Sequence, residues 1–301
     1  MRAATSVAKG ASRPTAPGLR EALLIWGLVI VDVAIIAVTY TRLPPEDLYR
    51  TSVGGLRGGL GRALVELNFP LALIALGLLT VAANALLDSH RRLVIWISAI
   101  AIPLCALTGV VVDQKDLDAA PRNVLPAIGV ALIAVLTVIA VRANGAEPTP
   151  SARGDPLRIG LAVLLALLAV PWVFALLGFY APNPIFADEP SPDEPLAAVH
   201  LGGHHGFYGV LIALTGLALS RALPAFSHRR LTVASSAVLA LAVAYGLANA
   251  LQDFTLEQIW KRGTIDWKPP SVVLPSVSWG WLVILLAAAV VEIFWFRRER
   301  R

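Results

Sequence analysis

Eight apolar stretches, seven of roughly 20 residues and a shorter sixth one, are separated by short clusters of charged residues and dominate this sequence. A helix needs about 20 apolar residues to cross the hydrocarbon core of a bilayer, which is roughly 30 Å thick. A helix on the surface of a soluble core would instead show a polar stripe with a period of 3.6 residues. Stretches such as Ala22–Tyr40 and Leu282–Phe296 have almost no polar residues. The pattern therefore predicts an all-α integral membrane protein.

The composition agrees with this class, because only 15% of the residues are charged and 57% are hydrophobic. A soluble domain has about 25% charged and about 45–50% apolar residues. We predict about eight transmembrane helices: Ala22–Tyr40, Phe69–Leu87, Leu93–Val112, Val124–Val141, Ile159–Phe179, Phe207–Leu219, Leu231–Leu251 and Trp279–Phe296.

The charged residues predict how these spans are oriented. With the N-terminus inside, the inner segments hold 16 basic and 5 acidic residues, whereas the outer segments hold 9 basic and 13 acidic residues. Cytoplasmic loops of membrane proteins carry an excess of Lys and Arg. Both termini are therefore predicted to be cytoplasmic. Arg outnumbers Lys by 21 to 4, a composition typical of a high-GC genome. The predicted location is a bacterial-type cytoplasmic (inner) membrane.

The net charge of +5 does not predict a nucleic-acid partner, because the basic residues lie beside the ends of spans and form no patch interleaved with aromatic residues. The lipid bilayer is the predicted environment, and a membrane-protein partner or a second copy of the chain remains open. The single cysteine, Cys105, excludes an internal disulfide and a cysteine-rich metal site.

The pentapeptide Ser-His-Arg-Arg-Leu occurs twice, at Ser89–Leu93 and at Ser227–Leu231, 138 residues apart. Each copy begins an odd-numbered span from the predicted cytoplasmic side. We interpret this as an internal duplication into two tandem four-helix repeats with the same orientation. The predicted organisation is a tail (1–21), a first four-helix half (22–142), a cytoplasmic linker (143–158) and a second four-helix half (159–301).

Three of the five histidines, His200, His204 and His205, lie close together in the sequence His-Leu-Gly-Gly-His-His-Gly, before the sixth span. If this segment is helical, His200 and His204 are i,i+4 neighbours on one face, a spacing that allows two imidazoles to bind one metal. Acidic residues on the same predicted outer side add possible oxygen ligands: Asp188, Glu189, Asp193, Glu194, Asp253 and Glu257. The pattern is compatible with a transition metal or a haem as cofactor, and the alternative is that these are ordinary histidines at the membrane interface.

Two acidic residues lie inside predicted spans. Asp32 is near the middle of the first span, where a carboxylate must be paired or protonated, so it is a candidate for proton or substrate coupling. Asp113 and Asp253, each beside a glutamine just past the outer end of a span, are assigned to the same role. Glu292 is close enough in sequence to Arg297 and Arg298 for the three to pair.

The first outer segment, Arg42–Glu66, is rich in glycine and is predicted to be a mobile lid or an amphipathic segment at the membrane interface. The sequence contains no lipase, metalloprotease, kinase or Walker motif, so it assigns no catalytic residue and no enzyme class. The leading hypothesis is an outward-facing, histidine-containing site for metal handling or redox chemistry. The alternatives are a proton-coupled transporter of small solutes that uses Asp32, and a non-catalytic subunit of an envelope membrane complex.

Overall fold

The computed structural model of the chain describes residues 16–68, 70–108, 116–120, 124–180, 198–274 and 278–300. Within these residues every regular element is helical, and one isolated parallel bridge joins Leu48 to Leu201. The elements are α1 (Leu19–Arg42), η1 (Pro45–Asp47), α2 (Gly55–Glu66), α3 (Leu71–Leu86), α4 (Arg91–Ala106), α6 (Val124–Asn144), α7 (Asp155–Leu176), α8 (His205–Ser220), η3 (Leu223–Ala225), α9 (Arg229–Asp253), the π-helix η4 (Phe254–Trp260), α10 (Trp279–Val291), the π-helix η5 (Glu292–Phe296) and α11 (Arg297–Glu299).

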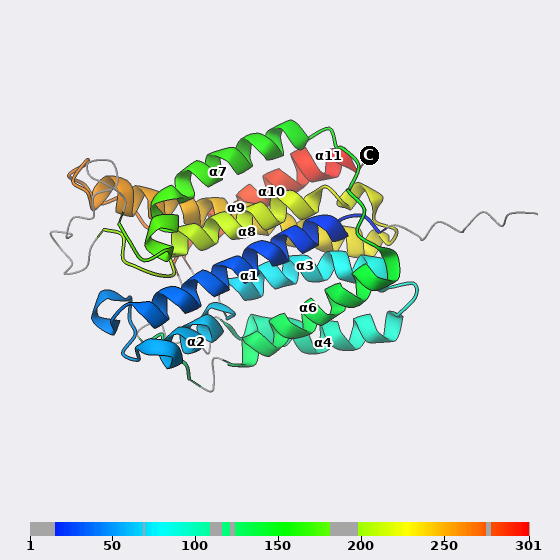
Figure 1. The fold of residues 1–301 in the computed structure, drawn as a ribbon. Coiled ribbons are helices and arrows are strands. Elements are labelled where there is room, and N and C mark those ends of the chain that lie inside the picture. Colours follow the sequence, from blue (N-terminus) through cyan, green and yellow to red (C-terminus); the bar gives the residue numbers. More distant parts are fainter. Residues whose placement is uncertain are drawn as a thin grey trace, which may run out of the picture.

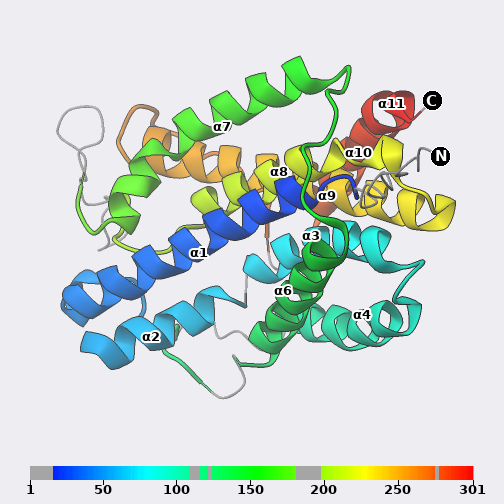
Figure 2. The same cartoon turned by 45° about the vertical axis from the view of Figure 1, so that its right-hand side comes forward.

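The long helices form an elongated bundle (Figure 1). Helix α1 runs through the middle of the bundle and packs on α2, α3 and α8. Helices α4 and α6 pack on each other on the side of the bundle away from α7, and the view turned by 45° shows the same arrangement (Figure 2). Helix α9 connects the rest of the bundle to α10, because it packs on α8 and α3 as well as on α10.

Six of the described helices are long and apolar enough to cross a bilayer, and the bent pair of α2 and α3, which meet at 51°, would make a seventh. The prediction of an all-α, multi-pass membrane protein is confirmed in this form. The finer count of eight spans stays a prediction, because only 16 residues of α4 are described and its predicted span, Leu93–Val112, continues beyond them. The tandem duplication also stays a prediction.

The outer surface of the bundle is apolar, as contact with lipid requires. Leu24 and Ile30 on α1 have relative exposures of 62% and 66%, and Leu286 on α10 has 59%. Soluble monomers rarely expose a continuous apolar surface of this extent, whereas hydrocarbon chains cover such a surface at no cost. The lipid bilayer is therefore the environment of the protein.

The two ends of the bundle differ in their polar contacts. The basic end, where α1, α4, α7 and α9 begin, is held by ion pairs from Arg158 to Glu299 and from Arg221 to Glu21 and Asp155. The distal end is the opposite one, where α1 ends and α8 begins. It contains the loop of residues 198–204, which precedes α8, and the C-terminal end of α9.

Glu292 does not have the partners that the sequence suggested. Its carboxylate pairs with Arg300 and accepts a hydrogen bond from Ser236 on α9. The difference arises because residues 292–296 form a π-helix, which changes the angular offset between Glu292 and the arginines that follow. This contact connects η5, which begins at Glu292, to α9.

The C-terminal part of the glycine-rich segment Arg42–Glu66 is helical, since α2 covers Gly55–Glu66. Its glycines allow it to approach α1 at backbone contact. A Cβ placed on Gly59 would lie 2.3 Å from the carbonyl oxygen of Ala37, far inside the van der Waals distance. As a result, the polar residues near the end of α2, Arg62 and Glu66, are buried in the interior of the bundle.

Candidate metal site at the distal end

The loop of residues 198–204 places His200 and His204 beside each other. Gly202 in this loop has a φ of 111°, a left-handed conformation that L side chains rarely adopt, and it turns the chain between the two histidines. His204 is the N-cap of α8, with an extended backbone. The helical i,i+4 geometry considered from the sequence is therefore absent. The turn nevertheless brings the two rings together, with centroids 4.7 Å apart.

Two carboxylates from the end of the neighbouring helix hold the ring of His204 on both sides. Asp253 Oδ2 lies 3.1 Å from Nδ1 of His204, and Glu257 Oε2 lies 2.8 Å from Nε2. Asp253 is the last residue of α9 and Glu257 is four residues later in η4, so both project from one face of the same helical end. The side chain of His204 is only 2% exposed, so water does not screen these contacts.

The charges of these acids change the protonation of the histidines. Burial alone lowers the pKa of His204, but the charge of Glu257 and the contact with Asp253 outweigh burial and raise this pKa to about 10. Burial, together with the charge of His204, lowers the pKa of His200 well below its usual range. Without a metal, His200 is therefore a neutral imidazole with a free lone pair at neutral pH.

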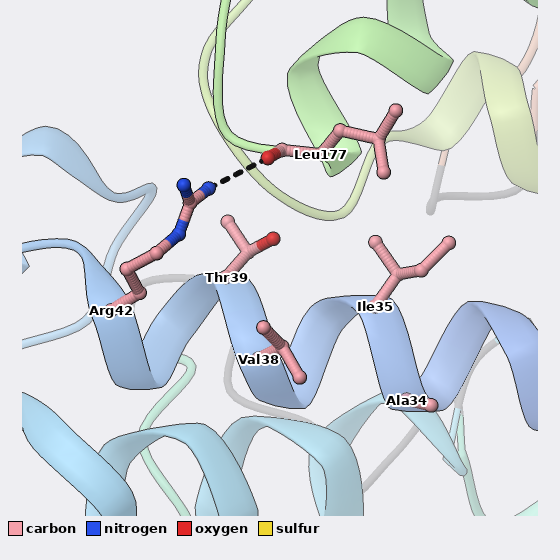
Figure 3. A pocket seen from close by; sticks show the side chains of 6 residues that line it. All are labelled: Ala34, Ile35, Val38, Thr39, Arg42 and Leu177. Atoms are coloured by element: carbon pink, nitrogen blue, oxygen red, sulfur yellow. Dashed lines mark hydrogen bonds between the residues drawn. The ribbon is translucent and has the colours of Figure 1, made fainter.

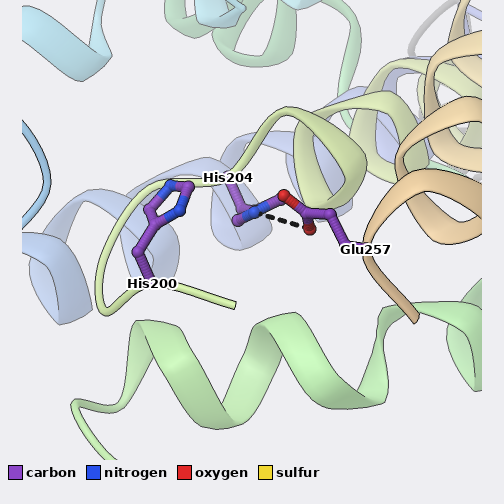
Figure 4. Close-up of side chains that lie close together, drawn as sticks. All are labelled: His200, His204 and Glu257. Carbon is purple, nitrogen blue, oxygen red and sulfur yellow. Dashed lines mark ion pairs between the residues drawn. The ribbon is translucent and has the colours of Figure 1, made fainter. Parts of the chain in front are cut away.

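One ligand atom from each of His200, His204 and Glu257 lies within 4.8 Å of the other two (Figure 4). Two atoms bonded to the same zinc ion, each at about 2.1 Å, are at most about 4.2 Å apart. To bind one ion, the three ligand atoms would have to move closer together and His204 would have to lose the proton on its ligand nitrogen. Among the described residues, this is the only group of three histidines, cysteines or acids with that spacing.

Aromatic side chains surround the group and restrict its movement. Tyr49 stacks on His200 with ring centroids 3.9 Å apart, and Trp172 lies nearly parallel to His204 at 5.5 Å. The indole N–H of Trp172 also donates a hydrogen bond of 3.1 Å to Oε2 of Glu257. Trp172 is completely buried, so it is a rigid support for two of the three candidate ligands.

The remaining residues named from the sequence occupy different positions. His205 is the first residue of α8 and lies outside the group of three. Asp32 lies in the middle of α1, buried and without a hydrogen-bond partner for either carboxylate oxygen. Five of the acids considered lie outside the described residues: Asp113, Asp188, Glu189, Asp193 and Glu194.

From the sequence, Glu257 was only one of several outer acids that could supply an oxygen ligand, and neither Tyr49 nor Trp172 was predicted. One sequence signal for Glu257 was present. Asp253 and Glu257 are i,i+4 neighbours at the end of a span, which places two carboxylates on one helix face. The aromatic residues come from other parts of the chain, so no local pattern points to them.

A separate groove of about 240 Å³ lies between α1 and the end of α7, lined by Ala34, Ile35, Val38, Thr39, Arg42 and Leu177 (Figure 3). Its lining is almost entirely apolar, and Arg42 at one end donates a 2.8 Å hydrogen bond to the carbonyl oxygen of Leu177. Among the described residues, the groove brings together no cluster of histidines or acids, so it does not compete with the histidine group as a candidate metal site.

Comparison of the chain with known protein families, with curated proteins and with solved structures gives no match in any of the three.

Proposed function

We propose that the protein binds one divalent transition-metal ion at its distal end through His200, His204 and Glu257. The observation that carries this proposal is the convergence of three ligand atoms within 4.8 Å, from a loop and from a helix end that are far apart in the sequence. Asp253 on the other nitrogen of His204 completes the arrangement. Histidine ligands usually donate their second N–H to a carboxylate or carbonyl group, which fixes the ring for the metal.

This set of ligands favours zinc or another metal with a similar preference for nitrogen and oxygen ligands. Two imidazoles and one carboxylate, without a thiolate, are the ligands of many catalytic zinc sites, which keep a fourth position open for water or substrate. A haem held between the two histidines is disfavoured, because ring centroids 4.7 Å apart leave no room for a porphyrin between the rings. We therefore favour metal handling at the membrane surface, or chemistry at the open position, over haem-based redox chemistry.

Metal content tests the proposal directly. Protein purified in mild detergent and equilibrated with zinc is expected to hold about one equivalent per chain, measured by mass spectrometry of the metal after removal of free ions. Glu257→Gln is expected to lower the occupancy several-fold, because it removes the charged ligand while keeping its shape. His90→Ala is the matched control, because His90 lies at the basic end and should leave the metal content unchanged. A wild-type protein that binds no transition metal would refute the proposal.

The proposal also includes a side of the membrane, because the excess of basic residues predicts that the distal end faces outward. We expect an impermeant maleimide to label Glu46→Cys, but not Arg91→Cys, in intact cells. Both positions are exposed, Glu46 at the distal end and Arg91 at the basic end, and both variants are made in a Cys105→Ala background. Labelling of Arg91→Cys alone would reverse the orientation and place the metal site at the cytoplasmic face.

A second candidate function, proton-coupled transport, is supported by a different observation. Asp32 is 3% exposed and both of its carboxylate oxygens lack a partner. Intramembrane acids that are not used structurally commonly belong to proton or substrate pathways.

A further inference from the structure

A buried ionic cluster lies in the bundle where α1, α2 and α8 meet. We call it the Arg62 cluster, and it consists of Asp32, Arg62, Glu66 and Tyr208. The relative exposures of Asp32, Arg62 and Glu66 are 3%, 4% and 1%. The cluster is distinct from the histidine group, since none of its members belongs to the three candidate ligands.

Glu66 has the partners of an ionised carboxylate. Its Oε1 lies 2.8 Å from Nη2 of Arg62, and its Oε2 accepts a hydrogen bond from the hydroxyl of Tyr208. The guanidinium of Arg62 also lies 5.2 Å from the centroid of the Tyr40 ring, a cation–π distance. Arg62 and Glu66 therefore form an ion pair whose charges cancel inside the bundle.

Asp32 has no such partner. Both of its oxygens are buried without a hydrogen bond, although the charges of Arg62 and Glu66 both act on it. The charge of Asp32 also acts on Tyr208 of α8. Among the described helices, α3 has no ionisable residue, and the charged residues of α6 and α7 lie at the basic end, so they do not pair with Asp32.

The charge balance of the cluster then determines its protonation. One guanidinium faces two acids, and it can neutralise only one of them. A second carboxylate without a cation or hydrogen-bond donors cannot stay ionised in an interior of low dielectric constant, so it takes up a proton instead. Since Glu66 already has the ion pair and the tyrosine, Asp32 is the acid that holds this proton.

We propose that the Arg62 cluster is an intramembrane proton-binding site, which holds one exchangeable proton on Asp32 while Glu66 is ionised. Loading forms one O–H bond on a carboxylate oxygen of Asp32, and release breaks that bond and returns the proton. No oxidant, reductant or other reactant takes part. The inference is independent of the metal site.

The cluster also contacts the loop that precedes α8. A Cβ placed on Gly203 would lie 2.3 Å from the hydroxyl of Tyr208 and 2.7 Å from Oε1 of Glu66. The loop that carries the histidines therefore lies directly against the ion pair, and a larger residue at this position would require the side chains of Tyr208 and Glu66 to move. A change in the conformation of this loop would therefore shift the side chains of the Arg62 cluster that contact Gly203.

Infrared spectroscopy of metal-free protein tests the charge balance. Protonated and ionised carboxyl groups have separate carbonyl bands, and the band of a protonated acid shifts when its proton exchanges for deuterium. At neutral pH we expect one protonated-acid band that Asp32→Asn removes and that ¹³C labelling of aspartate carbonyls shifts. Glu66→Gln is also expected to remove this band, because Arg62 is then free to pair with Asp32 and keep it ionised.

Two further variants, which remove the cation of the cluster, complete the test. Arg62→Gln removes the only cation, so both acids should be protonated and the band should roughly double. The double variant Arg62→Gln/Glu66→Gln leaves Asp32 alone and should restore a single band, which keeps the test valid if Arg62→Gln alone fails to fold. Helical circular dichroism and a monodisperse elution profile identify the folded variants. A wild-type spectrum without a band that depends on Asp32, or a band insensitive to Glu66, would overturn the inference.

Discussion

His204→Ala is expected to abolish metal binding at the distal end. His204 is the one side chain in the group that contacts both carboxylates and lies beside His200. Its removal leaves one imidazole and one carboxylate, which are too few to hold a transition metal against a chelator. The expected result is a fall from about one equivalent of metal to background after dialysis.

Asp253→Asn provides the graded companion to this experiment. Asparagine keeps the shape of the side chain and an oxygen that can accept from Nδ1 of His204, but it removes the negative charge. Loss of such an outer-shell partner typically weakens metal affinity by about 10- to 100-fold. Competition with a chromophoric chelator should show this shift with unchanged stoichiometry at saturating metal.

His205→Ala is the matched control, because His205 is adjacent in sequence but lies outside the group of three ligands. It should bind metal as the wild-type protein does. If His205→Ala loses the metal and His204→Ala keeps it, the ligand assignment is wrong.

Gly246→Leu is expected to prevent the bundle from folding, because α8 and α9 touch at their backbones there. A Cβ on Gly246 would lie 2.5 Å from the amide nitrogen of Ala213 and 2.6 Å from the carbonyl oxygen of Gly209. These are helix backbone atoms, so no side-chain rotation relieves the clash and the helices must separate. Overpacking a core commonly costs about 1–3 kcal/mol, and a backbone clash should reach at least the top of that range.

The measurement is the yield of monodisperse protein in detergent and its midpoint of thermal unfolding. Gly246→Ala should give an intermediate loss. Gly27→Leu is the matched control, since Gly27 is also in a membrane-spanning helix but a Cβ there meets no atom within 4 Å. Equal stability of Gly246→Leu and Gly27→Leu would show that the close approach of α8 and α9 is not required.

The sequence by itself determined the class of this protein. Long apolar runs fit a bilayer, because a helix of about that length crosses the hydrocarbon core. Such a helix satisfies its own backbone hydrogen bonds in lipid and needs no polar stripe. It also selected the segment that contains His200 and His204, because histidines are scarce in this chain and three of them are close together. Asp32 could be singled out for the same kind of reason, as a charge in an apolar run.

Only the tertiary structure decided which groups those residues meet. The glycines in Arg42–Glu66 suggested a mobile lid or an amphipathic segment at the membrane interface, and in the structure they allow α2 to pack on α1, which buries Arg62 and Glu66 near Asp32. In the same way, Glu257 meets His204 because α9 continues into a π-helix at the distal end. Both sites depend on helix ends and backbone approaches between segments far apart in the chain, which periodicity and local spacing do not encode.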